Sequence, residues 1–597
     1  MNTQIISHLG KLYKRPVRAT RSGSLFSAFP YPTKISPEAV ALFIATHSNP
    51  GDTIFDGFGG SGTTGLATLL CSSPPGALLE EARRLNLPAK WGPRKAVVYE
   101  LGALGTFIGE TLCSPPDPKE FAKAARQVLT DCEAAYGWMY AAKDPSGKQG
   151  TIRHAVWTDL LVCPYCGKEL ALWSACVKLD PANIEASFKC PKCDNDCSLS
   201  TIEHAKIEVY DPLLHSNFVQ RKRKLAWIYG ETGKRRWARP VGSSDNALVK
   251  RVYEQPIPAS APIVPMRWGD LHRNGYHQGI THVHHFYGRR NLIALGALWA
   301  RTAKYSEPIR SALKFWILTY NASHSTLMTR VVAKQNQRDL VVTSAQSGVL
   351  YISGLPVEKN VFSGLKRKLK TVDKAFTATR NLEGSVVVRQ RSCTDIELPD
   401  QSIDYVFTDP PFGGNIPYSE VNFINEAWLG NFTNPTDEVI ISNAQKKTVD
   451  NYQALMTKSF MELSRIIKKG GQLTVVFHSA EASVWNALRK SYEAAGLSVE
   501  MSSILDKKQG SFKQVTAGTV RGDPLLLLTK KQQEAAKSTV DIWQITMELL
   551  NKARELKDPS ETTPQRLYAR LVTHYLSHNQ QVPIDAATFY EHLAKSF

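Results

Sequence analysis

The stretch best suited to chemistry is TDPPFG, residues 408–413, which directly follows the apolar run 403–407. The β-branched and aromatic residues of that run predict a buried strand, and the two prolines predict its end because proline cannot donate a ladder hydrogen bond. We therefore expect the Asp409 carboxylate, the Pro410 carbonyl and the Phe412 ring to lie together at one end of a strand.

These three groups suit a reaction at the exocyclic amine of adenine or cytosine, a weak nucleophile whose lone pair is delocalised into the ring. Asp409 and Pro410 could each accept one N–H, which favours a tetrahedral nitrogen, and Phe412 could stack on an extruded base. Such a nitrogen could attack an electrophilic methyl group held in line. An ordinary strand-ending turn is the alternative. The candidate catalytic residues are Asp409, Pro410, Pro411 and Phe412.

A glycine-rich turn lies about 350 residues earlier, in TIFDGFGGSGTTG at 53–65. A short apolar strand precedes it and residues 66–70 predict the start of a helix, so backbone amides at a helix N-terminus could approach a ligand closely. The turn is not a phosphate loop of the GxxxxGK type, and we expect it to bind a nucleotide-like cofactor. The candidates are Asp56, Phe58, Gly59, Gly60, Gly62, Thr63 and Thr64.

FGGSGTT and TDPPFGG resemble the cofactor-binding and catalytic motifs of amino-group DNA methyltransferases that use S-adenosylmethionine. The similarity is closest to adenine-specific DNA methylases with an inserted zinc ribbon, because IPYSEVNFINEAW follows the catalytic motif and HQGITHVHHFYGRRNLIAL lies in the insert. The resemblance covers most of the chain. It implies an α/β fold with a Rossmann-like methyltransferase sheet, S-adenosylmethionine as cofactor, and double-stranded DNA with a flipped base as partner.

The resemblance also implies further contacts with the cofactor. Lys34, in FPYPTK, matches the motif at the methionine end of the cofactor, and Glu100, after the apolar strand 97–99, matches the ribose-binding carboxylate. An acidic residue after the second strand has a physical reason, because it can accept hydrogen bonds from ribose hydroxyls. Asp395 matches the residue near the cofactor adenine, with an exposed loop aspartate as the alternative.

The substrate base is predicted from Asp409. In the resembling families Asp-Pro-Pro with an aromatic residue usually goes with adenine and Ser-Pro-Pro with cytosine, so Asp409 favours the six-position amine of adenine. The implied setting is restriction-modification or phage defence, with partner subunits. Two other functions stay open: an RNA base methyltransferase, because RNA also presents extruded bases, and a non-catalytic DNA-binding subunit of a defence complex.

The net charge of the chain favours a polyanionic partner. Its 597 residues include 73 Lys and Arg against 54 Asp and Glu, which gives a net charge of +19 and an isoelectric point near 9.3. Residues 1–14 lack the long apolar core of a secretory signal, and no run of about 18 apolar residues occurs. We therefore expect a cytoplasmic protein without a membrane span.

A chain of this length predicts two or three domains. Prolines at 115, 116 and 118 end the first part, and strand patterns resume near 386. The insert thus falls between the second and third strands, earlier than the recognition region of the resembling enzymes. We expect the methyltransferase domain at 1–112 and 386–530, the insert at 113–385 and a helical tail at 531–597.

Several elements are predicted around the motifs. Within the insert, residues 120–140 and 291–300 predict helices. After the catalytic motif we expect a helix at 452–467 that ends in Lys468, Lys469 and Gly470, then a strand at 472–478. A helix at 483–495 and a strand at 524–529 would complete the sheet.

Two CxxC pairs lie in the insert, separated by 23 residues, within an expected ribbon at about 151–207. Each pair can direct two thiolates at one metal, and four thiolates close a tetrahedral zinc site that leaves no position for water. Disulfides are the alternative, which a reducing cytoplasm disfavours. The predicted ligands of a structural Zn2+ are Cys163, Cys166, Cys190 and Cys193, while Cys176 and Cys197 lack the paired spacing.

A basic stretch interleaved with Trp227, Tyr229 and Trp237 follows the cysteines. Cations neutralise phosphates and aromatic rings stack on bases, so this combination favours nucleic acid. A solvated face whose tryptophans belong to the local core is the alternative. The predicted nucleic-acid-binding residues are Arg221, Lys222, Arg223, Lys224, Lys234, Arg235 and Arg236.

Five histidines lie between 272 and 285 and raise the question of a second metal. Their spacing fits no helical HxxxH arrangement and no glutamate lies among them. The predicted methyl transfer also needs no metal, because it proceeds by positioning. We therefore do not expect a metal site at His272, His277, His282, His284 and His285.

Overall fold

The computed structural model describes residues 12, 17–19, 23–335, 337–346, 348–414, 416–507, 523–530, 541–555 and 559–596. The chain divides into two compact units. Unit 1 comprises Met1–Pro115, Lys374–Ser419 and Phe432–Phe597, and unit 2 comprises Pro116–Asp373 and Glu420–Asn431. The chain therefore leaves unit 1 twice, and the second excursion carries most of the sequence motif that follows TDPPFGG.

Unit 1 is built on an eight-stranded sheet with the order β1-β22-β23-β21-β20-β2-β3-β19. Neighbouring strands are parallel, except that β23 runs antiparallel to β21 and β22. This is a doubly wound, Rossmann-like α/β order into which one antiparallel strand has been inserted. The strands are β1 Val17–Ala19, β2 Thr53–Asp56, β3 Lys95–Glu100, β19 Ser385–Gln390, β20 Ile403–Thr408, β21 Ile467–Val476, β22 Ser498–Lys507 and β23 Asp523–Thr529.

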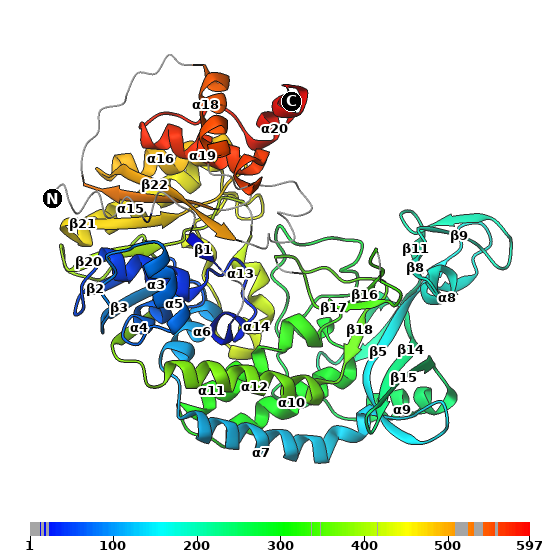
Figure 1. Ribbon diagram of the computed structural model, residues 1–597. Helices are drawn as coiled ribbons and strands as arrows, with labels where there is room; N and C mark the ends of the chain where they lie inside the picture. Colours follow the sequence, from blue (N-terminus) through cyan, green and yellow to red (C-terminus); the bar gives the residue numbers. More distant parts are fainter. Residues whose placement is uncertain are drawn as a thin grey trace. The chain divides into compact units, whose positions relative to one another are not determined.

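Helices flank this sheet on both sides (Figure 1), and its central strands β2, β20, β21 and β23 are mostly buried and apolar. All seven residues of β23 are buried, for example. The main helices of unit 1 are α3 Pro37–His47, α4 Thr63–Leu70, α5 Gly76–Arg84, α6 Ala103–Cys113, α15 Val449–Ile466, α16 Ala482–Ala494, α18 Ile542–Glu555, α19 Pro564–Ser577 and α20 Ala586–Ser596.

The described C-terminal helices belong to the same core as the sheet. Leu571 of α19 and Phe589 of α20 are fully buried in one cluster with Phe460 of α15 and Leu526 of β23. The prediction of helices in this tail is thus confirmed for the described residues, and their apolar faces complete the core of unit 1.

One prediction about the second half of the sheet is wrong, and one strand was not predicted. Lys468, Lys469 and Gly470 do not end a helix, because α15 stops at Ile466 and β21 starts at Ile467. Lys468 instead forms an ion pair of 2.5 Å with Asp404 of the neighbouring strand β20. The sequence analysis also missed β22, whose serines interrupt the apolar pattern.

Unit 2 contains a seven-stranded sheet. The sequence analysis predicted a zinc ribbon at about 151–207 but no sheet that extends beyond it. Its central strand β5, Gln149–Val162, pairs with β14, and strands β4, β6, β11 and β18 also pair with β5. The other members are β4 Ala141–Lys143, β6 Glu169–Ala171, β11 Glu203–His204, β14 Arg223–Thr232, β15 Arg235–Pro240 and β18 Val357–Lys359. Separate two-stranded ribbons are β7 Val177–Leu179 with β8 Ala182–Ile184, β9 Ser187–Lys189 with β10 Asp196–Ser198, β12 Lys206–Asp211 with β13 Ser216–Arg221, and β16 Arg330–Val332 with β17 Val341–Thr343.

Helices α7, α10 and α11 of unit 2 pack against one another (Figure 1). Helix α7 starts where Asp117 accepts hydrogen bonds from the amides of Lys119 and Glu120, with Pro118 in the first helical position. The predicted helices at 120–140 and 291–300 are confirmed with shifted ends. Unit 2 includes α7 Pro118–Tyr136, η1 Gly137–Tyr140, α8 Leu172–Cys176, α9 Ser243–Glu254, η2 Val283–Phe286, α10 Arg289–Thr302, α11 Ile309–Leu318, η3 Asn321–Ser325, α14 Phe423–Leu429 and most of α12 Val361–Thr379.

Among the residues that the structure describes, no helix is both long enough and apolar enough to cross a lipid bilayer.

Candidate functional site

Asp56, the last residue of β2, organises the glycine-rich turn. Its Oδ1 accepts hydrogen bonds from the Phe58 amide at 3.0 Å and the Thr408 hydroxyl at 2.8 Å, and its Oδ2 accepts one from the Thr64 hydroxyl at 2.6 Å. The carboxyl is only 4% exposed, and burial raises its pKa to about 6 although the three hydrogen bonds lower it. One side chain thus ties together the turn, the first turn of α4 and the end of β20.

The turn requires glycine at Gly62, the residue before α4. Gly62 has φ of 81°, in the left-handed region, and a Cβ there would lie 2.6 Å from the Cα of Gly109 in α6. A Cβ on Gly59 would lie 2.1 Å from Val98 of β3. The glycines therefore let the turn pack closely on β3 and α6, with the N-terminus of α4 beside it.

Glu100 ends β3 and closes the turn from the other side. Its two carboxylate oxygens accept hydrogen bonds from the amides of Gly60 at 2.6 Å and Gly102 at 2.7 Å. Glu100 lines the same cavity as the turn. This placement fits the predicted role in binding ribose hydroxyls.

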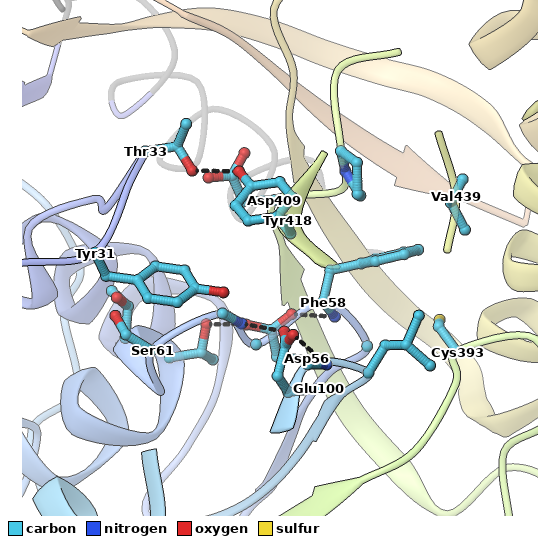
Figure 2. A pocket seen from close by; sticks show the side chains of 18 of the residues that line it. Tyr31, Thr33, Asp56, Phe58, Ser61, Glu100, Cys393, Asp409, Tyr418 and Val439 are labelled. Carbon is cyan, nitrogen blue, oxygen red and sulfur yellow. Dashed lines mark hydrogen bonds between the residues drawn. The ribbon is translucent and has the colours of Figure 1, made fainter. Parts of the chain in front are cut away.

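The cavity of unit 1 lies at the ends of β2, β3 and β20 (Figure 2). Ser61 lines it and is only 3% exposed, and its hydroxyl has no hydrogen-bond partner among the described residues. A buried hydroxyl without a partner is costly, so this oxygen is expected to meet a ligand. The residues present therefore fit a polar, nucleotide-like cofactor.

A pair of tyrosines forms one wall of this cavity. Tyr31 and Tyr418 stack with ring centroids 6.2 Å apart, and the Tyr418 hydroxyl is 2.7 Å from that of Thr33. Figure 2 shows both rings among the side chains that line the cavity. Burial raises the pKa of Tyr418, so the phenol stays protonated at neutral pH.

Lys34 also lines the cavity, but its ammonium group is directed at the backbone. It donates to the carbonyls of Leu25, Phe26 and Phe29, with Nζ–O distances of 3.4, 3.0 and 3.5 Å. Burial lowers its pKa to about 8, against a smaller opposite effect of Glu38. In this arrangement Lys34 shapes the wall near the turn, and its predicted contact with the cofactor remains a prediction.

The predicted catalytic residues follow β20 as expected. Asp409 and Pro411 line the cavity, while Pro410 is buried. The Tyr452 hydroxyl donates a 2.8 Å hydrogen bond to the carbonyl of Pro411, which fixes the turn. The ring of Phe412 is partly buried and meets Phe477 edge to face, with centroids 5.3 Å apart.

Asp395 does not lie with the other predicted cofactor-binding residues. It is exposed and is not among the described residues that line the cavity, where Ser392 and Cys393 lie instead. The sequence analysis also missed Ser61, Thr433 and Glu438. Ser61 was within the glycine motif, but Thr433 and Glu438 belong to a loop that carried no signal in the sequence.

The four predicted zinc ligands converge in unit 2. The Sγ atoms of Cys163 and Cys193 are 3.7 Å apart, as are those of Cys166 and Cys190, and all four lie within 4.8 Å of one another. A tetrahedral site with Zn–S bonds of about 2.3 Å has sulfur atoms about 3.8 Å apart, so these thiols could hold zinc.

The predicted basic stretch divides into two parts. Arg221 and Arg223 both contact the fully buried Asp159, at 2.8 and 2.6 Å. Lys222 pairs with Glu169, and Trp237 is buried. The exposed members are Lys224, Lys234, Arg235 and Arg236, of which the last three lie at the turn between β14 and β15.

No protein family model matches this chain, and no curated protein is similar enough in sequence to count as a match. Solved structures with a similar part include the antibiotic-resistance methyltransferase Kmr, at 16% identity over 28% of this chain and 73% of that one, with a TM-score of 0.15. The geranyl diphosphate C-methyltransferase from Streptomyces coelicolor A3(2), in complex with Mg2+, geranyl diphosphate and S-adenosyl-L-homocysteine, matches at 8% identity over 28% and 60%, with a TM-score of 0.15. The [4+2]-cyclase SpnF matches at 11% identity over 28% and 65%, with a TM-score of 0.16.

Proposed function

We propose that this chain transfers a methyl group from S-adenosylmethionine to the six-position amine of adenine in DNA. The observation that carries the proposal is the lining of the unit 1 cavity, where Asp409 faces the same space as the glycine turn and Glu100. Candidate cofactor residues and the candidate catalytic carboxylate lie more than 300 residues apart in sequence, yet they share one cavity.

The sheet of unit 1 supports this proposal independently of the motifs. Its Rossmann-like order agrees with the α/β sheet that the resemblance of the two motifs implies. Ligands of such sheets bind beyond the carboxyl ends of the strands, where Asp56, Glu100 and Asp409 lie.

Different residues of the cavity would bind different parts of the cofactor. When bound, S-adenosylmethionine would supply an electrophilic methyl group. Glu100 would accept hydrogen bonds from the ribose hydroxyls, Ser61 would bind a polar atom, and the amides before α4 would favour the carboxylate of the methionine end. Asp56 holds these groups in place through its three hydrogen bonds.

Asp409 and Pro410 would prepare the amine for attack. The Asp409 carboxylate and the Pro410 carbonyl would each accept one amine hydrogen, which localises the lone pair on the nitrogen and makes it a better nucleophile. Methylation of the nitrogen would release S-adenosylhomocysteine and one proton, and Asp409 would accept that proton. Phe412 would stack on the flipped base after a shift from its contact with Phe477.

The proposed substrate rests on charge and on one residue type. The net charge of +19 and the exposed cations at the β14–β15 turn favour nucleic acid. Adenine is favoured because Asp, and not Ser, precedes the two prolines. In this function the four thiols of unit 2 would hold a structural zinc ion that folds the ribbon. A role beside partner subunits of a restriction or defence system is part of the same proposal.

Methyl transfer from radiolabelled S-adenosylmethionine to duplex DNA, to RNA and to no nucleic acid tests this function. We expect label in the duplex only, and N6-methyladenine as the new nucleoside after digestion and mass analysis. N4-methylcytosine as the only product would show that the substrate base is cytosine and not adenine. Label in RNA alone would favour the RNA methyltransferase. DNA binding without label in any acceptor would favour a non-catalytic subunit.

A further inference from the structure

A second cavity lies within unit 2, and the proposed methyl transfer does not use it. It has a volume of about 640 Å³, which is in the range of pockets for small ligands, roughly 300–1,000 Å³. Its walls come from the hairpin β12–β13, the start of β14, the η2 turn and the N-terminus of α10.

Guanidinium groups give this cavity an excess of positive charge. Arg221 is 6% exposed and its Nε has no hydrogen-bond partner in the described part of the chain, although its Nη1 contacts Asp159. Arg223 shares that carboxylate, so one negative charge serves two arginines. Arg289 donates to the carbonyls of Tyr253 and Gln255, and no carboxylate partner is found for it among the described residues.

The carboxylate of Asp211, which also lines the cavity, is already saturated. Its Oδ2 is 2.7 Å from Nε2 of His284 and 2.8 Å from Nε2 of His285, and its Oδ1 accepts from the amides of Leu213 and Leu214. Asp211 stays negatively charged, because these hydrogen bonds lower its pKa, but all four donors hold it within the β12–β13 hairpin and the η2 turn.

The same three side chains could be read as metal ligands, but one hydrogen bond argues otherwise. The Thr281 amide donates to Nδ1 of His285, so the proton of a neutral His285 imidazole lies on Nε2 and is donated to Asp211. A metal at that nitrogen would have to displace this proton. Nδ1 of His284, a residue that lines the cavity, is buried and has no hydrogen-bond partner among the described residues.

Aromatic side chains complete the lining. Tyr210 and Tyr253 are 61% and 56% exposed, which is unusual for rings of this size, and both line the cavity. Exposed tyrosines beside arginines form a stacking surface for a planar, negatively charged ligand. The N-terminus of α10 adds no further anion site, because the buried Glu358 carboxylate lies beside Gly288 and pairs with Arg290, Nη1 to Oε2 at 3.0 Å.

We infer that this cavity binds a nucleotide, with the phosphate on Arg221 and Arg289 and the base stacked on Tyr253. The nucleotide is either free in solution or one unit of a nucleic-acid strand, since both present the same phosphate and ring. This second site does not depend on the methyl-transfer reaction proposed for unit 1.

Isothermal titration of the full chain with deoxythymidine monophosphate and with a single-stranded oligothymidylate tests the inference. Both probes carry thymine, so they should not compete for the unit 1 cavity, which is proposed to bind a cofactor that contains adenine. Tyr253→Ala changes an exposed side chain, and Arg289→Gln removes one charge. The matched controls are Tyr165→Ala, an exposed tyrosine that does not line the cavity, and Arg338→Gln, an exposed arginine.

We expect each cavity variant to weaken binding roughly tenfold or more, because a stacked ring and a charge-assisted hydrogen bond each contribute about that much. The two controls should bind like the wild type. Loss of affinity for both probes identifies a free nucleotide as a ligand, and loss for the oligothymidylate alone identifies a nucleotide within a strand. Unchanged affinity of Tyr253→Ala for both probes would overturn the inference. Binding of inorganic phosphate as tight as the binding of either probe would also overturn it.

Discussion

The hydroxyl of Thr408 donates a 2.8 Å hydrogen bond to Oδ1 of Asp56, and so joins the last residue of β20 to the last residue of β2. Thr408 is fully buried and directly precedes Asp409. The position of the proposed catalytic carboxylate is thereby coupled to the carboxyl group that organises the glycine turn.

Removal of this hydroxyl should affect both cofactor binding and turnover. In Thr408→Val the shape of the side chain is nearly kept, but Asp56 loses one buried donor, which should cost about 1–2 kcal/mol of unfolding free energy. Cofactor affinity, measured by titration calorimetry, should fall several-fold and kcat should fall with it. Thr46→Val is the control, because the Thr46 hydroxyl is also buried but donates to the carbonyl of Leu42 within its own helix. Equal effects of both variants on cofactor affinity would refute the coupling.

Asp409→Ala should abolish methylation while the protein stays folded. We expect kcat to fall by two or more orders of magnitude, because one of two amine acceptors is lost, while cofactor affinity changes little. Asp404→Asn alters a carboxylate of the same strand outside the cavity, and it should retain activity. Normal turnover by Asp409→Ala would remove this residue from the proposed mechanism.

Asp56 should leave a pH-dependent signature in stability. Burial raises its pKa to about 6 from an ordinary value near 3.8, so the folded state binds the proton more tightly than the unfolded chain. Its contribution is then fully present below pH 4 and is lost as the pH rises through 6. Relative to Asp56→Asn, the unfolding free energy of the wild type should decline by roughly 2–3 kcal/mol from pH 4 to pH 7. The unfolding free energies are measured by urea unfolding between pH 4 and pH 7. An equal change with pH in the two proteins would contradict a raised pKa of Asp56.

The sequence alone placed both chemical motifs at strand ends, because apolar runs and glycine or proline interruptions are local signals. It could not predict that Thr408 meets Asp56, since a side-chain contact across 352 positions depends on the strand order. It also missed Glu438, which joins the wall of the cavity through a loop and accepts hydrogen bonds from Ser419. No periodicity marks a loop residue of that kind.

The basic stretch shows a different limit of sequence reasoning. Four consecutive cations at 221–224 resemble a solvated face, but alternation along the strands turns Arg221 inward onto Asp159 while Lys224 stays exposed. The buried carboxylate lies on β5, more than 60 residues earlier, so neither its place nor its pairing could be derived from the spacing.

Purified protein should contain about one zinc ion per chain. Cys190→Ser should lower the zinc content and the thermal stability of the ribbon, because a structural site gains its folding energy from all four thiolates. Cys197→Ser is the matched control, since Cys197 is buried nearby but lies outside the four-thiol group. Atomic absorption and thermal unfolding measure both effects. A second zinc equivalent that disappears in His284→Ala would show instead that the Asp211 cluster binds metal.

The exposed cations at the β14–β15 turn should contribute to DNA affinity without regard to sequence. Substitution of Lys234, Arg235 and Arg236 by Gln should weaken binding to unrelated duplexes alike. It should also reduce the slope of log K against log salt by up to roughly 3, since each lost phosphate contact removes about 0.9. The fold should be unaffected, because all three side chains are exposed.

Arg221→Gln should behave differently from that triple variant. It leaves the fully buried Asp159 with one arginine fewer, which should lower the unfolding free energy by about 3 kcal/mol or more. A triple variant of Lys119, Lys123 and Arg126, exposed on α7, controls for the change in net charge. Fluorescence anisotropy at several salt concentrations, together with urea unfolding, separates the two roles. If the turn variant and the α7 control have the same salt slope, the turn contacts no phosphate and acts only through net charge.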